Sequence, residues 1–91
     1  MLITNTDFVP GRDIDEALGL VTGVGVPPFK LTLRTEQIGK IIEEGVERAN
    51  NSMIAKAQAM GADAIIRVYY DKEASETGVQ IMVWGTAVRL K

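Results

Sequence analysis

The chain has 91 residues, of which 46% are hydrophobic, 24% charged and 5% aromatic, and its net charge is −2. This length and composition predict one globular domain over residues 1–91 and exclude a disordered chain. A pI near 5.0 argues against the basic surface of a nucleic-acid-binding domain. The apolar runs are far shorter than a membrane span, so we expect neither nucleic acid nor membrane as a partner.

Cysteine and histidine are both absent from the chain. Disulfides, thiol nucleophiles, His-based triads and imidazole metal ligands are therefore excluded. Zinc and copper are normally held by thiolate or imidazole, so the ligand inventory predicts no zinc or copper site. The opening residues lack the basic and apolar regions of a secretory signal, and we expect a cytoplasmic location.

The first third of the chain predicts a short strand over residues 2–6, a turn at Pro10–Gly11 and a longer strand from Ile14 to Val26. Side chains alternate with period two along the longer strand. One face carries Leu18, Leu20, Thr22, Val24 and Val26, and the other carries Ala17, Gly19, Val21, Gly23 and Gly25. Alternate glycines make the second face flat, which favours a closely packed helix or a bend in the strand. A ligand approaching the backbone is the alternative.

The clearest predicted element is a long helix over residues 35–60. Pro27–Pro28 ends the preceding strand, and residues 29–34 form a connector of undetermined type. Thr35 is a suitable N-cap, and apolar or small residues then recur at three- and four-residue steps. Gly61 is the natural residue to follow the C-terminus. Such a helix is about 39 Å long at 1.5 Å per residue.

Two strands are predicted after the helix, over residues 64–70 and 79–90, with a polar hairpin loop over residues 71–78. The order β-β-α-β-β predicts an α+β fold in which one long helix crosses a mostly antiparallel sheet. Arg67 is a cation in an otherwise apolar strand. An edge charge, or a pair with a carboxylate, is the simpler interpretation, and a ligand or pore contact in an oligomer is the alternative.

The last strand is apolar on both faces. Val79, Ile81, Val83 and Ala87 fall on one face, and Met82, Trp84, Val88 and Leu90 fall on the other. One helix covers only one face, and a 39 Å helix overhangs a globule whose expected radius of gyration is about 12 Å. Large exposed apolar patches are rare in monomers, so we expect other copies of the chain to cover the second face. Burial under residues 29–34 is the alternative. Trp84 is the expected core or interface anchor.

The densest carboxylate group consists of Asp13, Asp15 and Glu16. Clusters of oxygen ligands suit hard cations such as Mg²⁺ or Ca²⁺, so these three residues are the candidate metal ligands. A solvated strand edge is the simpler interpretation. Gly23-Val24-Gly25 is not a dinucleotide-binding loop, because Pro27 follows and no third glycine opens a helix.

An enzyme built on this chain would have to use carboxylates, lysine or tyrosine. Tyr69, Tyr70 and Lys72 are available for such chemistry. No pair of these groups has a diagnostic spacing, and we expect the protein not to be an enzyme.

Three segments together resemble the YbjQ-like family, which carries the label heavy-metal-binding. They are Thr4 with Gly11-Arg12, Ile14, Glu16 and Leu18 to Gly23; Gly61 to Ile66 followed by Val68; and Gly85-Thr86-Ala87-Val88. The resemblance covers nearly the whole chain. It implies a dodecin-like α+β subunit in a homopentameric ring, with no established biochemical activity. The metal label gains no support from a chain without Cys or His.

The chain departs from the family pattern at Arg67, where a small residue is usual, and at Ala17, where an aromatic is common. The glycine-rich segment around residues 26–34 is also shortened, which bears on any pocket built there. The sequence predicts a non-enzymatic cytoplasmic homo-oligomer that binds a small molecule or hard cation at subunit junctions. The number five comes from the resemblance alone. A metal-binding protein is the alternative, and an enzyme of unknown reaction is a second.

Overall fold

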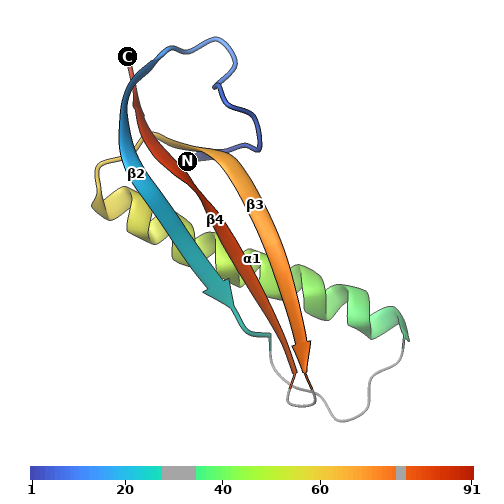
Figure 1. Cartoon of the computed structure of the whole chain (residues 1–91). Coiled ribbons are helices and arrows are strands. Elements are labelled where there is room, and N and C mark those ends of the chain that lie inside the picture. Colours follow the sequence, from blue (N-terminus) through green and yellow to red (C-terminus); the bar gives the residue numbers. More distant parts are fainter. Residues whose placement is uncertain (28–34, 76–77) are drawn as a thin grey trace.

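A computed structural model describes residues 1–27, 35–75 and 78–91. The elements are β1 (Leu2–Ile3), β2 (Ile14–Gly25), α1 (Thr35–Ala59), β3 (Ala64–Ser75) and β4 (Gly78–Leu90). The strands form one sheet in the order β1-β3-β4-β2, in which β1 and β3 are parallel and the other pairs antiparallel. The helix α1 crosses one face of this sheet (Figure 1). The predicted α+β fold with one long helix is confirmed.

The helix has nearly the predicted bounds and ends in a glycine cap. Gly61 has a φ of +80°, and its N–H donates to the carbonyl of Gln58 at 3.0 Å. The N–H of Ala62 donates to the carbonyl of Ala57, also at 3.0 Å. This pair of bonds is the Schellman motif, in which glycine is favoured because the capping residue is left-handed. The predicted cap by the Thr35 side chain lies outside what the structure describes.

The flat glycine face of β2 packs against α1, as predicted. A Cβ built on Gly23 would lie 2.7 Å from the backbone nitrogen of Met53, and one on Gly25 would lie 2.6 Å from that of Ala49. The helix also has a glycine at this contact, because a Cβ on Gly45 would lie 2.8 Å from Ile81 Cγ1 of the sheet. Strand and helix therefore approach at backbone distance, which leaves no room for side chains at these positions.

A β-bulge interrupts the alternation at the start of β2. The pairing with β4 shifts register between Ala17 and Gly19, and Gly19 has a φ of +131°. The shift turns Leu18 toward the helix side, where it packs against the buried core. The predicted placement of Leu18 on the face of Leu20 is therefore wrong, because one extra residue in a bulged strand reverses the side-chain direction. The close contact with α1 also stops short of Gly19, whose Cβ would lie 3.8 Å from Met60 Cε.

A second bulge lies in β3 at Arg67, which has a φ of +53°. The register against β4 shifts between Ile66 and Tyr69. Ile65 and Val68 consequently both pack in the core under α1, whereas strict alternation put Val68 with Ile66. The extra residue of the bulge reverses the side-chain direction here, as it does at Leu18.

The strand β3 is also longer than predicted. Its second half, which includes Lys72 and Ala74, pairs with Ile81 and Val79 of β4. The polar composition of residues 71–75 suggested a loop, but cross-strand pairing to the long apolar β4 outweighs the low strand propensity of these residues. The predicted loop over residues 71–78 is wrong up to Ser75, and residues 76–77 lie outside the described part of the chain.

The left-handed backbone at Arg67 leads to a stability prediction. We expect Arg67→Gly to be more stable than Arg67→Ala by about 1 kcal/mol, because a Cβ is strained at positive φ. Both variants lose the Arg67–Asp7 ion pair, so it cancels from the comparison. Urea denaturation measures the difference. At Asp71, an exposed site in the same strand, alanine should be the more stable of the two. A lower stability for glycine at both sites would contradict this account.

The N-terminal segment covers one end of the sheet face opposite α1. Val9 is buried there against Ala64, Ile66 and Val88. Backbone bonds from Arg67 to Thr6 and from Val68 to Thr4 tie this segment to β3. Part of the second apolar face is thus covered within the chain, by a segment whose role the sequence analysis did not predict.

The molecule is elongated, with extents of 49 × 22 × 16 Å and a radius of gyration of 14.9 Å (Figure 1). A compact chain of this length has a radius of gyration near 12 Å. The accessible surface is 5985 Å², against about 5,200 Å² for a typical monomer of this mass. The long strands and helix therefore leave more surface uncovered than a compact monomer would.

Candidate functional site

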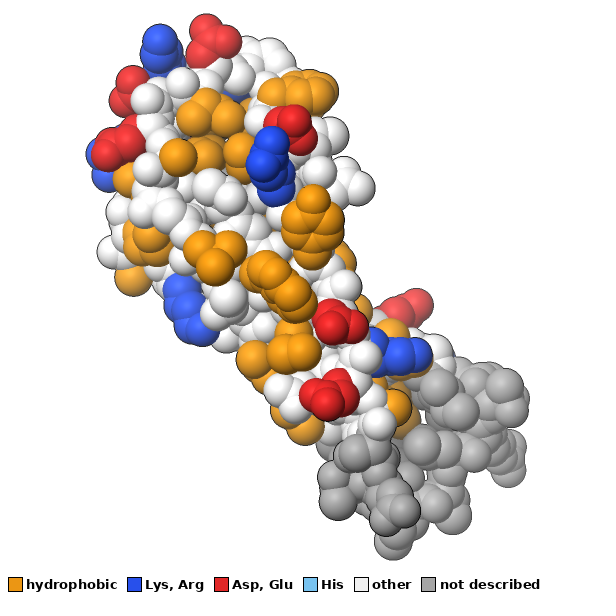
Figure 2. Space-filling model, in the orientation of Figure 1, with side chains coloured by type: hydrophobic (Ala, Val, Ile, Leu, Met, Phe, Trp, Pro, Cys, Tyr) orange, Lys and Arg blue, Asp and Glu red, His pale blue; other side chains and the backbone are white. Residues whose placement is uncertain are grey.

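The uncovered part of the outer sheet face carries an apolar surface, here called the outer patch. It consists of Leu20, Val24, Tyr69, Met82 and Trp84. Trp84 stands at its centre, directly opposite Thr22 of β2 and Tyr69 of β3. Leu20 is 68% exposed and Tyr69 is 64% exposed. Figure 2 shows apolar side chains gathered along the middle of this face.

A hollow of about 360 Å³ lies within the outer patch between β2 and β4. Leu20 and Val24 line it from β2, and Met82 and Trp84 line it from β4. The predicted division of β4 is confirmed, since Ile81 and Val83 are buried under α1 while Met82 and Trp84 lie on the other face, only partly buried. The role of Trp84 as an interface anchor stays a prediction.

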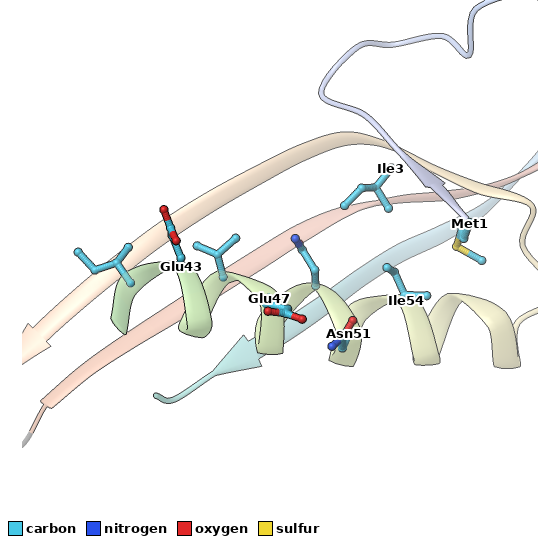
Figure 3. Close-up of a pocket in the computed structure, with 9 residues that line it drawn as sticks. Met1, Ile3, Glu43, Glu47, Asn51 and Ile54 are labelled. Carbon is cyan, nitrogen blue, oxygen red and sulfur yellow. The ribbon is translucent and has the colours of Figure 1, made fainter. Parts of the chain in front are cut away.

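A second apolar surface lies on the helix side and is here called the side groove. It has a volume of about 490 Å³ and runs between α1 and the N-terminal segment (Figure 3). Its lining residues are Met1, Ile3, Ile42, Glu43, Val46, Glu47, Asn50, Asn51 and Ile54. The groove exists because α1 lies mainly over β2 and β4 and reaches β3 only slightly. The spacing of Ile42, Val46 and Ile54 marked a helix face, but no sequence signal placed the N-terminal residues beside it.

The candidate metal ligands Asp13, Asp15 and Glu16 are all exposed. Glu16 Oε2 lies 3.4 Å from Arg89 Nη1, and the backbone carbonyl of Asp13 accepts a bond from the Lys91 N–H. Over residues 1–27, 35–75 and 78–91, the structure gathers no group of three or more His, Cys, Asp or Glu side chains that could hold a metal ion. A hard-cation site at these carboxylates stays a prediction.

The remaining chemical candidates lie apart. Tyr69 stands on the outer face, while the Tyr70 hydroxyl donates to Asn50 Oδ1 at 2.8 Å on the helix side. Lys72 pairs with the buried Ile81 and so shares the helix side with Tyr70. The sheet therefore separates Tyr69 from Tyr70 and Lys72. Arg67 forms an exposed ion pair with Asp7 at 3.5 Å. This agrees with the simpler interpretation of Arg67, in which it pairs with a carboxylate.

The helix on a four-stranded mixed sheet defines a class of small α+β proteins, and this chain leaves two apolar surfaces uncovered. A crystal structure of a protein with unknown function from Pediococcus pentosaceus, which belongs to the DUF74 family, has the same fold. The TM-score is 0.73 and the identity 22%, over 100% of this chain and 98% of that chain.

Sequence comparisons identify the family. A family model described as "Putative heavy-metal-binding" matches residues 31–91. A UPF0145 protein of Photobacterium profundum is 38% identical over 103 residues, covering 99% of this chain and 100% of that protein. A UPF0145 protein of Halorubrum lacusprofundi is 30% identical over 111 residues, covering 100% of both chains. The chain belongs to the YbjQ family, as the resemblance indicated. No helix in the described part of the chain is long and apolar enough to cross a membrane.

The donor set does not fit the soft metals that the family description suggests. The chain has no Cys or His, and its candidate carboxylates are not gathered into a cluster. Five-fold or other symmetry can repeat a ligand around an axis, but it repeats only what each subunit carries. Oxygen ligands alone favour hard cations and exchange them readily in water.

We therefore expect no binding of Zn²⁺ or Cu²⁺ tighter than roughly micromolar at neutral pH. Calorimetry in a buffer of low metal affinity measures this directly, with Mg²⁺ and Ca²⁺ titrated in parallel. The double variant Asp13→Ala/Asp15→Ala is the matched control. Stoichiometric zinc binding with a dissociation constant below micromolar that persists in this variant would contradict the prediction, because it would show a tight zinc site without Cys, His, Asp13 or Asp15.

Proposed function

We propose that the protein is a non-enzymatic, cytoplasmic homo-oligomer that holds a small molecule or a hard cation at the junctions between its subunits. The family resemblance makes five the expected number of subunits. The outer patch is the observation that carries this proposal, because its aromatic and aliphatic side chains lie together and largely exposed on a small chain. Monomers seldom leave such a patch in water, and interface cores are enriched in Trp, Tyr and Met.

The elongated shape supports the same conclusion. An accessible surface above that of a typical monomer is expected of a subunit whose second layer comes from other chains. A sheet that is apolar on both faces needs cover beyond its one helical layer, and the N-terminal segment supplies only part of it. Hollows such as the one beside Trp84 would close between two subunits and offer an enclosed site for a small ligand.

Native mass spectrometry of untreated protein tests the proposal, because it reports stoichiometry and co-purifying ligand together. We expect a multiple of the 9.9 kDa subunit mass with additional bound mass. A stable 9.9 kDa monomer at micromolar concentration would overturn the proposal. The alternative of a metal-handling protein draws on the family description alone, and the calorimetry above tests it.

A further inference from the structure

We propose that the subunits join head to tail, with a basic flank of α1 in one copy seated on the side groove of the next copy. This inference rests on the proposed self-association and names the surfaces that meet. It also means that the groove, open in a single chain, becomes a junction site only when a second copy closes it.

The helix carries three rows of side chains at four-residue spacing. Gly45, Ala49, Met53 and Ala57 form the buried row against the sheet. A second row lines the side groove and consists of Ile42, Val46, Asn50 and Ile54. This row lies on the β3 side of the helix, because Asn50 accepts a hydrogen bond from Tyr70 of β3. On the β2 side lies the basic flank, defined as Lys40, Glu44, Arg48, Ser52 and Lys56, and placed there by the bond from Arg48 Nη1 to the Val26 carbonyl at 3.2 Å. Two opposite sides of one helix thus present different surfaces.

The charges on these two surfaces are complementary. The basic flank holds three cations and one carboxylate, a net side-chain charge of +2. The carboxylates in the lining of the side groove are Glu43 and Glu47, one turn apart and both exposed (Figure 3). Opposite potentials across an interface steer association and fix register. The aliphatic stems of Lys40 and Arg48, about 12 Å apart along the helix, can also cover the apolar floor of the groove while their charged groups reach the carboxylates.

The sheet permits the same arrangement. Both β2 and β3 run antiparallel to β4, so they point in one direction. In the described part of the chain, no strand lies outside β2, and none lies outside β3 from Tyr69 onward. A neighbouring copy of the same orientation can therefore stand with its β2 side beside this β3 side, and helix beside helix. Contacts between two different surfaces are heterologous, and they form a ring when the rotation from one copy to the next closes.

Ring closure also accounts for the outer patch. Sheets joined side by side around an axis turn one face inward and one outward. The proposed ring keeps the exposed charged side chains of α1 in water on the outside, so the outer patches of all copies converge on the inside, where Leu20, Val24 and Trp84 lose their exposure to water. Association with further copies of the chain therefore covers both the side groove and the outer patch, whereas a partner bound to the groove alone leaves the outer patch in water.

Charge reversal tests the head-to-tail contact. Glu43→Lys/Glu47→Lys and, separately, Lys40→Glu/Arg48→Glu place like charges at the junction. We expect each to weaken association at least ten-fold, measured by light scattering over a dilution series. The four-fold variant carrying all these changes restores opposite charges and should recover the wild-type assembly. Arg12→Glu/Lys91→Glu matches the second variant in net charge, alters residues outside both surfaces, and should assemble normally. All of the altered residues are exposed, and thermal melting verifies that each variant is folded.

The outcomes separate this inference from the proposed function. A monomeric wild-type protein overturns both. A wild-type oligomer that the two double variants leave intact, or that the four-fold variant fails to recover, overturns the head-to-tail contact and leaves the homo-oligomer standing. Recovery in the four-fold variant, together with dissociation of both double variants, supports the contact. Wild-type association should also weaken as salt screens the charges.

Discussion

Gly23→Val is expected to unfold the chain or to lower its free energy of unfolding by more than about 4 kcal/mol. A Cβ at this position meets the carbonyl of Ala49 and lies 2.7 Å from the nitrogen of Met53. These are backbone atoms of α1 that cannot rotate away, so the helix would have to lift off the sheet. Chemical denaturation, or circular dichroism if no transition remains, measures the effect.

Thr22→Val is the matched control for Gly23→Val. Thr22 is exposed on the opposite face of the same strand, and valine suits a strand, so we expect a change within about 0.5 kcal/mol. Gly19→Val should fall between the two, because its φ of +131° strains a β-branched residue although Met60 leaves room for it. Equal melting temperatures for the three variants would refute the close approach of β2 and α1.

Trp84→Ala is expected to leave the subunit folded and to weaken self-association by at least about 2 kcal/mol, roughly 30-fold in the dissociation constant. The indole stands in the middle of the outer patch, between Thr22 and Tyr69, and forms one wall of the hollow beside Leu20. Truncating it removes the largest apolar side chain from the surface that the proposed oligomer buries. Light scattering over a dilution series measures the shift toward monomer.

Trp84→Phe serves as the control, since it keeps an aromatic ring on the patch and should retain most of the association. Thermal melting at a concentration where both variants are monomeric checks that the subunit is folded. An assembly that is unchanged by Trp84→Ala would show that the outer patch is not an interface.

Local sterics and periodicity were sufficient to predict the helix and its packing. The recurrence of small and apolar residues from 38 to 60, followed by Gly61, requires only the 3.6-residue turn and a left-handed cap. The glycines of β2 favoured a closely packed helix over a bound ligand, because a strand face without side chains lets another element approach the backbone. The two apolar faces of β4 likewise followed from period two, and they anticipated that one helix would not cover the sheet.

Features that depend on a neighbouring strand could not be predicted in this way. The bulges at Gly19 and Arg67 reverse the faces of Leu18 and Val68, and each arises from the register against β4 rather than from local preference. The extension of β3 to Ser75 likewise follows from pairing with β4, which supplied an ordered partner for a polar segment.

The sequence by itself determined the element order, the single helical layer and the absence of thiol and imidazole chemistry, because these follow from residue types and spacings along the chain. Only the tertiary structure decided where the uncovered surfaces lie. The N-terminal segment folds over Ile66 and Val88, and the helix crosses nearer to β2 than to β3, so the outer patch and the side groove are what these two placements leave open. Both depend on contacts between residues far apart in the chain, which neither local propensity nor periodicity encodes.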